Sequence, residues 1–490
     1  MYDKQHLHPI TILLNFLKII KETIAAVAVI FVLNIKNIPW NPMDPHFKWT
    51  LLGLLIAFFL VCLLLVLAWV FWRKYTYWVE NEELHVEKGL FVKKHQYVPF
   101  ERIQSVNFKE SIFHRPFGLV KVTIETAGSE DSGIALTAIS REQADWIDAA
   151  TKRAKRHEKI AEDGAVAAPQ QHVTREMVYH MTTKNLLILA TTSSGIGVIF
   201  SAVAAVMSQL SDVIPYELIF NELKDFMKYG ILIVSLIVFT VLFISWLISV
   251  VITYLNHANF IVEREQDRLF ISKGLLEKKR VAVPMSRIQG IKIVETPLRQ
   301  LFGFAAIHLE SAGNTEEDGD SKISLVPLIK KREALELLSE LFPTYQFEHT
   351  LVKAPKRAAW RFMVFFSAWA VIPVALVSYF VPLGYGLYSL VVLPLLMLFG
   401  YAEYRSSGFA LHDKQLTLVT RRFSKESFFV MKQRIQTMQV RQSVLAERGD
   451  LARLHVSIVA GTAESETALR FFEKHKLMQI FDWYRPARRN

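Results

Sequence analysis

The chain has 490 residues, of which 52% are hydrophobic and 21% are charged, and its formal net charge is +11. This composition is too apolar for a soluble enzyme of this length and too charged for a protein that lies wholly within a membrane. The 34 Phe, 15 Tyr and 10 Trp residues exclude a disordered chain. The single cysteine, Cys62, excludes a disulfide framework and a zinc site built from cysteines.

Apolar segments long enough to cross a bilayer recur along the chain, since a spanning helix needs roughly 20 apolar residues. Four segments of about this length carry no charged residue: 49–72, 186–207, 229–254 and 362–381. The shorter segment 387–401 follows the last of these after a turn, and an N-terminal segment is interrupted by Lys18, Lys21 and Glu22 before an apolar run that ends at Leu33. We therefore predict six transmembrane helices in three hairpins.

The charges near the predicted helix ends indicate an orientation. The loop at residues 208–228 carries four acidic and two basic side chains, whereas basic residues such as Arg73, Lys74 and Arg405 flank the large hydrophilic regions. Short loops rich in Lys and Arg stay in the cytoplasm. We expect a multi-pass protein of the cell membrane, with both termini and all three hydrophilic regions in the cytoplasm.

An internal repeat determines the predicted organisation. Residues 88–128 align without a gap on residues 273–313, and 16 of these 41 positions are identical. The trio Arg-Ile-Gln at residues 102–104 recurs at 287–289 and again at 434–436. Gly89 and Gly274 occupy one repeat position, after a Lys and before an apolar strand, where we expect a positive φ. The third copy has diverged, because Arg421 stands at this position. The chain is therefore predicted to consist of three units, each a helix hairpin followed by a hydrophilic domain.

Each hydrophilic domain has the pattern of a small β-structure closed by a helix. Residues 120–126 and 306–311 alternate between apolar and polar side chains, as half-buried strands do. Amphipathic helices follow at 140–155 and 327–341. Six or seven antiparallel strands with one C-terminal helix are the outline of a pleckstrin-homology-like (PH-like) barrel. The predicted fold class is an α+β membrane protein with three transmembrane helix hairpins, each followed by a cytoplasmic PH-like β-barrel capped by a C-terminal helix.

These motifs resemble a known family. The hairpin-plus-domain unit and its pattern Lys-Gly-Leu, Val-Pro-x-x-Arg-Ile-Gln and Phe-Gly are similar to the bacterial membrane-flanked PH-like domain. The resemblance covers nearly the whole chain, strongly in the first two copies and weakly in the third. It implies the PH-like fold and assigns no catalytic residues. It also suggests a partner, a small companion membrane protein with a single PH-like domain.

The repeat and the apolar segments together define the expected boundaries. PH-like domains are predicted at 73–157, 255–345 and 402–490, after hairpin regions at 1–72, 186–254 and 359–401, with linkers at 158–185 and 346–358.

No motif of a catalytic, cofactor or metal site is present in the sequence. The chain contains no Gly-x-x-x-x-Gly-Lys phosphate loop, no His-Glu-x-x-His zinc motif and no Gly-x-Ser-x-Gly nucleophile turn. A strand histidine such as His308 is more often packed or solvated than a ligand. We expect no enzymatic activity and no cofactor.

The repeated Arg-Ile-Gln trio has two interpretations. Its arginines can grip a phosphate in a bidentate way and so bind lipid head groups. The alternative, which we favour, is a structural role in which Ile is buried while Arg and Gln bond to nearby backbone. The residues concerned are Arg102, Gln104, Arg287, Gln289, Arg434 and Gln436.

Basic clusters are the stronger candidates for contact with lipids or a partner, although a charge run is usually a solvated face. They comprise Lys93, Lys94, Lys278, Lys279, Arg280, Arg421, Arg422 and the tail residues Arg485, Arg488 and Arg489. Residues 402–490 carry 16 basic and nine acidic side chains, while the other two domains are nearly balanced. Near an anionic leaflet each basic residue contributes ~1 kcal/mol. We found no base-reading helix or aromatic RNA-binding motif, so the anionic inner leaflet is the expected partner rather than nucleic acid.

Two functions remain open. The first is a non-catalytic membrane scaffold that contacts lipids or partner proteins, in envelope maintenance or in resistance to membrane-active antimicrobials. The second is a component of a transporter or exporter, because six helices can form a pathway. Ionisable residues usually mark such a pathway, and five of the six predicted spans contain almost none, which favours the scaffold.

Overall fold

The computed structural model describes residues 4–17, 47–90, 92–126, 133–163, 175–192, 230–312, 322–348, 350–380, 382–460 and 463–485. The chain divides into two compact units. The first comprises Met1–Gln266 with Phe270–Ala282, and the second comprises Asp267–Leu269 with Val283–Asn490. Each unit is described by itself below.

The first repeat consists of two antiparallel sheets and a covering helix. The first sheet has the order β1-β2-β3-β4, and the second contains β7-β6-β5. Their bounds are β1 (Gln5–His6), β2 (Thr76–Glu80), β3 (Glu83–Lys88), β4 (Lys94–Pro99), β5 (Ile103–Glu110), β6 (Leu119–Thr126) and β7 (Ile134–Ser140). Helix α3 (Arg141–Asp163) follows. Alternate side chains of these strands, with Ala144 and Ile147 of α3, form one apolar core, as the period of two predicts.

The turn that begins β4 in the first repeat, and its counterpart in the second, need glycine. Gly89 and Gly274 have φ angles of +117° and +104°, a region that residues with a Cβ rarely adopt. A Cβ at Gly89 would overlap the carbonyl oxygen of Val92, and one at Gly274 would overlap that of Glu277. The positive φ that the repeated Lys-Gly-Leu motif predicts is confirmed.

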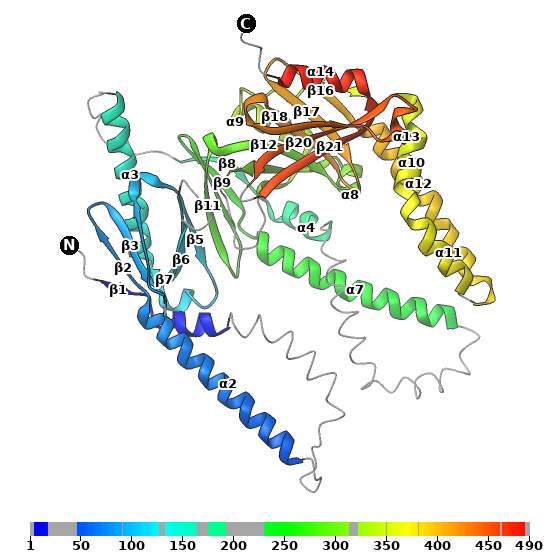
Figure 1. The fold of residues 1–490 in the computed structure, drawn as a ribbon. Coiled ribbons are helices and arrows are strands. Elements are labelled where there is room, and N and C mark those ends of the chain that lie inside the picture. The colour runs from blue at the N-terminus through cyan, green and yellow to red at the C-terminus, as the bar shows by residue number, and fades with distance from the viewer. Residues whose placement is uncertain are drawn as a thin grey trace. The chain divides into compact units, whose positions relative to one another are not determined.

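The second sheet of the first repeat continues into strands of the second repeat. Its order is β7-β6-β5-β11-β10-β9-β8, and β11 lies beside β5 in Figure 1. The added strands are β8 (Glu176–His180), β9 (Ile261–Glu265), β10 (Arg268–Lys273) and β11 (Lys278–Pro284). Residues 278–280 pair antiparallel with residues 108–110. Strands from two successive repeats therefore share one hydrogen-bonded sheet.

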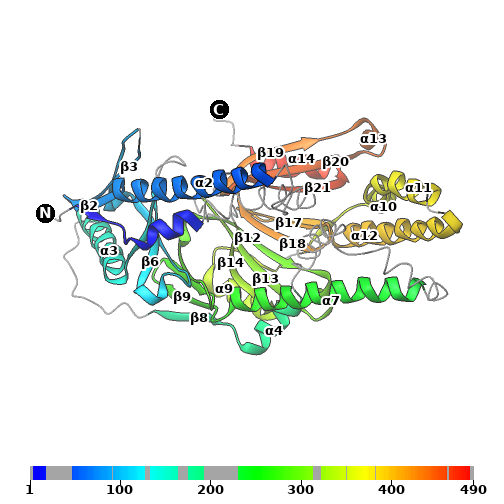
Figure 2. The same ribbon diagram turned by 90° about the horizontal axis from the view of Figure 1, so that it is seen from below.

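The same arrangement recurs one repeat later. A seven-stranded sheet has the order β14-β13-β12-β18-β17-β16-β15, and Figure 2 shows β12 and β18 side by side. The strands are β12 (Ile288–Glu295), β13 (Phe304–Ser311), β14 (Lys322–Lys330), β15 (Val352–Lys353), β16 (Gly408–Leu411), β17 (Gln415–Arg421) and β18 (Lys425–Met431), and α9 (Lys331–Leu341) follows β14. A Cβ at Gly290 of β12 would lie 2.5 Å from the ring of Phe428, so this glycine permits the close approach of the two repeats.

A three-stranded sheet completes the third repeat. Its order is β19-β20-β21, with β19 (Ile435–Arg441), β20 (Leu451–Ala460) and β21 (Ala463–Glu473). Helix α14 (Lys474–Tyr484) closes the domain. Its buried Leu477 and Ile480 belong to a core shared with β16–β21. The β-structure followed by a helix was expected, whereas closure of each domain into a barrel stays a prediction. The strand pairing that joins successive repeats was not predicted.

Four helical segments of the described ranges are long and apolar enough to cross a membrane: Leu51–Lys74, Phe239–His257, Lys356–Phe380 and Gly386–Ser406. They lie in α2 (Phe47–Lys74), in α7 (Gly230–His257), in α10 (Ala359–Ser367) with α11 (Val371–Phe380), and in a stretch ending with α12 (Val392–Ser406). Helix α4 (Thr183–Thr191) begins the predicted third span, whose remainder lies outside the described residues, as does the predicted span near 18–33. Six spans therefore stay a prediction.

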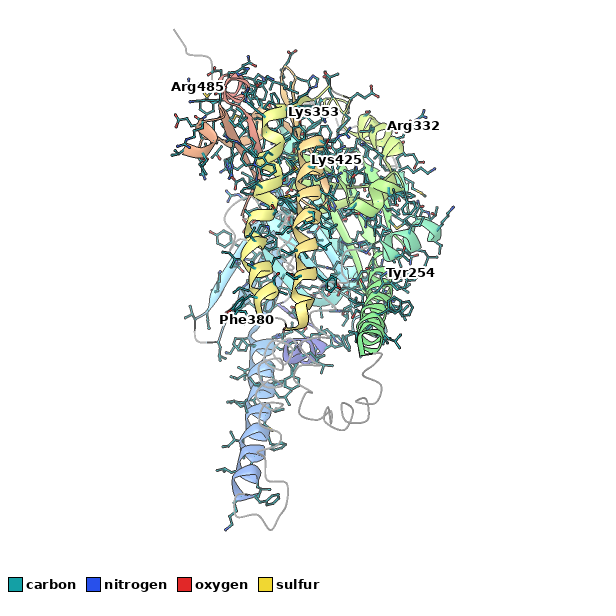
Figure 3. The ribbon with its side chains drawn as sticks, turned by 90° about the vertical axis from the view of Figure 1, so that its right-hand side faces the viewer. Tyr254, Arg332, Lys353, Phe380, Lys425 and Arg485 are labelled. Atoms are coloured by element: carbon teal, nitrogen blue, oxygen red, sulfur yellow. The ribbon has the colours of Figure 1, made fainter. Side chains whose placement is uncertain are left out.

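The last pair of apolar segments forms the expected hairpin. Figure 3 shows its two arms side by side, with Lys353 near one end and Phe380 at the other. A Cβ at Gly400 of α12 would lie 2.6 Å from the carbonyl oxygen of Phe362 in α10. The close backbone approach is typical of membrane helices that pack through small residues, and it leaves no channel between these two helices at that level.

Candidate membrane interface

Each repeat exposes large apolar side chains at the turn between the first two strands of its second sheet. Phe113, Leu298 and Leu445 keep 48%, 56% and 73% of their surface exposed. They occupy one repeat position, because Leu298 follows Phe113 by 185 residues and Leu445 follows Leu298 by 147 residues. We call the turns at 111–118, 296–303 and 443–449 the apolar tips. Apolar side chains exposed at one place usually mark an interaction surface.

Short helical turns hold the apolar tips in shape. The first tip contains a 3₁₀ turn at Arg115–Phe117 that ends at Gly118 with φ +61°. In the second, Pro297 begins helix α8 (Pro297–Leu301), which ends before Gly303 with φ +72°. Pro at the first helical position and Gly after the end are typical helix limits. The exposed side chains are therefore carried on fixed backbone.

The third tip lies at the start of the apolar segment Lys356–Phe380. Its helix α13 (Val444–Glu447) is bound to α10, because Arg361 donates a hydrogen bond of 2.7 Å to the carbonyl oxygen of Leu445. Arg357 donates one of 3.1 Å to that of Gly449 and also forms an ion pair of 3.3 Å with Glu473. Since the apolar segment begins at Lys356, the exposed Leu445 lies beside the start of a segment that is long and apolar enough to cross a membrane.

The first tip lies beside the end of another apolar helix. The ring of Phe117 contacts His8, with the ring centroids 5.6 Å apart. The preceding residue, Leu7, accepts a hydrogen bond of 2.7 Å from the indole nitrogen of Trp72, near the end of α2. Tryptophans are enriched where membrane helices meet the head-group region. Two of the three tips are therefore placed at helix ends within their own compact units.

The basic cluster of the second repeat lies at the strand junction with the first repeat. Lys278 is paired with Glu110 across β11 and β5, and Lys109 forms an ion pair of 2.9 Å with Glu277. Lys279 pairs with the same Glu277 at 3.5 Å. Arg280 is half-buried over the ring of Phe270 and lies 3.9 Å from Glu263. The residues of this predicted cluster therefore contact other residues of the protein itself.

The cluster of the third repeat is similarly placed. Lys425 forms an ion pair of 3.4 Å with Glu295 of β12, and Arg421 donates a hydrogen bond to Gln300. Burial lowers the pKa of Lys425, and the nearby Glu295 carboxylate opposes that shift. Arg422 is exposed. In the first repeat, by contrast, Lys93 and Lys94 are exposed at β4.

The Arg-Ile-Gln trios adopt one local structure in all three repeats. A 3₁₀ turn ends at Arg102, Arg287 and Arg434, and the following Ile is buried in each copy. Gln289 donates a hydrogen bond of 3.0 Å to the carbonyl oxygen of Arg287, and Arg434 donates one of 2.7 Å to that of Ser286. These contacts agree with the structural interpretation.

The other predicted contact residues are more exposed. Arg102 and Gln436 are exposed, while the side chain of Gln104 lies outside those described. Arg485 stands over the ring of Phe481 and 3.8 Å from Asp482, at the end of α14 (Figure 3). Arg488 and Arg489 lie outside the described residues.

A cavity of about 300 Å³ beside Arg434 is lined by Asp267, Ser286, Tyr345 and Gln433 among others.

A buried polar network in the second sheets was not predicted from the sequence. Lys292 and Glu310 form an ion pair of 2.6 Å with side-chain exposures of only 6% and 0%. Their counterparts in the first repeat are Asn107 and Glu125, joined by a hydrogen bond of 3.0 Å. The signal that marks this network is the recurrence of a glutamate, Glu125 and Glu310, at one repeat position of these strands. No group of three or more His, Cys, Asp or Glu in the described ranges is placed to hold a metal ion.

Comparison with known proteins agrees with this architecture. The sequence model of the bacterial PH domain matches three times, at residues 19–155, 202–343 and 368–488. The chain belongs to the bacterial PH domain family. It is also 32% identical to the transmembrane protein YdbT of Bacillus subtilis (strain 168) over 495 residues, which cover 99% of this chain and 98% of that protein. No solved structure gives a significant match.

The resemblance drawn from the repeat is therefore confirmed. The chain is a membrane-associated, three-copy bacterial PH-domain protein similar to YdbT.

Proposed function

We propose that this protein is a non-catalytic membrane scaffold whose PH-like domains rest on the inner leaflet through the apolar tips. The observation that carries the proposal is the recurrence of exposed apolar side chains at one position of all three repeats, two of them beside ends of apolar helices. An ordinary soluble surface gives no reason for such recurrence. Contact of each domain with the leaflet would account for the recurrence.

The energetic contribution of the tips is modest, which suits an ordering role. Complete burial of a Leu or Phe side chain contributes roughly 1.5–3 kcal/mol, and a basic residue near anionic lipid adds ~1 kcal/mol. The helices already anchor the chain in the membrane, so this energy holds each domain at a fixed level. The excess of basic residues in 402–490 supports a preference for anionic lipid.

The proposal is tested with the full-length protein in lipid nanodiscs. A single cysteine at Leu445, in a Cys62→Ala background, carries an environment-sensitive fluorophore. We expect blue-shifted emission and strong quenching by lipids with a nitroxide close to the head group. The matched control is a cysteine at Arg332, an exposed position on α9 (Figure 3). Equal quenching at the two positions would contradict leaflet contact.

Several finer points remain proposals of the same kind. The cytoplasmic placement of the domains and both termini follows from the charge asymmetry of the sequence. Envelope maintenance and resistance to membrane-active antimicrobials are the processes that a leaflet-bound scaffold would serve. A small companion membrane protein with one PH-like domain stays a prediction. A role in a transporter receives no specific support, since the closely packed hairpin at Gly400 leaves no pathway between its own helices at that level.

A further inference from the structure

Successive repeats are joined by one kind of strand pairing. In the first unit, β11 pairs antiparallel with β5, and Lys278 lies opposite Glu110. In the second unit, β18 pairs antiparallel with β12, and Lys425 lies opposite Glu295. The two pairings have the same register, because the two lysines share one repeat position and the two glutamates share another. In the second and third repeats, β11 and β18 therefore pair with the first strand of the preceding repeat's second sheet, β5 and β12. We call β11 and β18 the receiving strands and β5 and β12 the donor strands.

The glutamate in this pairing is held from two sides. Glu295 forms an ion pair of 3.0 Å with Lys331, at the start of α9, in addition to its ion pair with Lys425. Glu110 is similarly approached at 3.5 Å by Arg141, at the start of α3. Opposite charges across neighbouring strands stabilise the pair and help to set its register. The donor strand is thus recognised by its backbone and by a terminal glutamate.

The receiving strand of the first repeat is β4, and no donor strand among the described residues pairs with it. Strand β4 ends its sheet in the order β1-β2-β3-β4. Tyr97 of β4 keeps 68% of its surface exposed, whereas its counterparts Ala282 and Phe429 keep 6% and 1%. Lys93 stands at the position of Lys278 and Lys425 and is exposed. An aromatic side chain exposed where both counterparts are covered marks an unfilled strand interface.

The chain's own remaining donor strand does not fit this edge. Strand β19 ends its sheet in the order β19-β20-β21. At the shared register, Gln442 takes the place of the glutamate and faces Lys93 of another copy. Docking of β19 from a second copy would therefore lack the glutamate that lies opposite a lysine in both internal junctions.

We propose that β4 is a docking edge for a separate chain that carries a PH-like domain. The first strand of that domain's second sheet adds antiparallel to β4, with a glutamate at its end that pairs with Lys93. The incoming domain covers Tyr97. Phe429, at the same repeat position in the third repeat, is covered in this way by neighbours that include Phe347, whose ring centroid lies 5.1 Å from that of Phe429. This proposal does not depend on leaflet contact, because it rests on strand edges alone.

The experiment places a photoreactive p-benzoylphenylalanine at Tyr97 of the full-length protein, expressed in its native cells. After irradiation, mass spectrometry identifies the crosslinked chain and the residue captured. We expect a different protein with a PH-like domain, crosslinked within the strand that ends in glutamate or in the segment after its helix. The same probe at Arg332 controls for random capture.

Charge reversal provides the second measurement. Lys93→Glu is expected to lower the crosslink yield about 5-fold, which corresponds to about 1 kcal/mol of pairing energy. Lys330→Glu, a reversal at another exposed lysine, should leave the yield unchanged, and replacement of the partner's glutamate by lysine should restore it in the Lys93→Glu variant. A crosslink to a second copy, a crosslink within the chain, a partner without a PH-like domain, or a yield no higher than at Arg332 would each overturn the proposal.

Discussion

The turn at Gly274 offers the sharpest test of the repeat architecture. Its φ of +104° and the overlap of an added Cβ with the carbonyl oxygen of Glu277 leave no room for a side chain. The turn is also bound to the end of α7, since Gly274 donates a hydrogen bond of 2.7 Å to the carbonyl oxygen of Ala258 and Leu275 donates one of 2.8 Å to that of Leu255. The backbone cannot shift to relieve the overlap without losing these bonds.

The expected cost of Gly274→Ala follows from two terms. A residue with a Cβ at positive φ costs roughly 1–2 kcal/mol, and forced overlap in a packed region costs about 1–3 kcal/mol more. The total is about 2–5 kcal/mol, and Gly274→Val should cost no less. For a domain of 150–250 residues, 1 kcal/mol lowers the melting temperature by about 2–4 °C. We expect a loss of roughly 4–20 °C and a lower folded yield.

The assay is thermal unfolding of the full-length protein in mild detergent, followed by tryptophan fluorescence. Gly118→Ala is the matched control, because Gly118 has φ +61° but an added Cβ would meet nothing within 4 Å. That variant should lose only the conformational term, roughly 1–2 kcal/mol. Equal melting temperatures for the two variants, or a Gly274→Ala protein as stable as the wild type, would refute the role assigned to the turn.

Three further predictions concern topology, the strand junction and the basic tail. A cysteine at Ser211, in a cysteine-free background, should react with an impermeant thiol reagent on intact cells, whereas one at Ser129 should not; the reverse result would invert the proposed orientation. Glu295→Gln should lower the free energy of unfolding by about 1–3 kcal/mol because Lys425 loses its partner. The thermal stability of this variant should rise with pH toward the ordinary lysine pKa of about 10.4, since a lysine whose folded pKa is lowered by burial binds more protons when unfolded. A loss of stability that does not change with pH would count against burial of an uncompensated charge. Reversal of the tail residues Arg485, Arg488 and Arg489 to Glu in the full-length protein should weaken the preference for anionic over neutral nanodiscs at low salt. Near 1 M salt the reversal should have no effect, because charges are screened beyond ~3 Å. The preference is measured by fluorophore quenching at the third apolar tip, and an unchanged preference would argue against a contribution from the tail.

Local and periodic features of this protein could be predicted from its sequence alone. The α+β class and the three-copy organisation followed from strand alternation and from identities at a constant spacing. The positive φ at Gly89 and Gly274 followed from their place in a turn, because glycine is the residue that such backbone requires. The burial of Ile in each Arg-Ile-Gln trio was likewise expected, because the trio recurs and a structural role was favoured for it. Each of these depends on residues close together in the chain.

The strand edges and the exposed surfaces were decided by the tertiary structure. The sequence marks Lys278, Lys279 and Arg280 as a basic cluster, but only the pairing of β11 with β5 reveals that this cluster joins two repeats. The exposure of Tyr97, beside the burial of Ala282 and Phe429, has the same origin. A strand's pattern specifies which face is apolar, yet it does not specify which strand lies at its edge. That choice depends on contacts between residues far apart in the chain, which local periodicity does not encode.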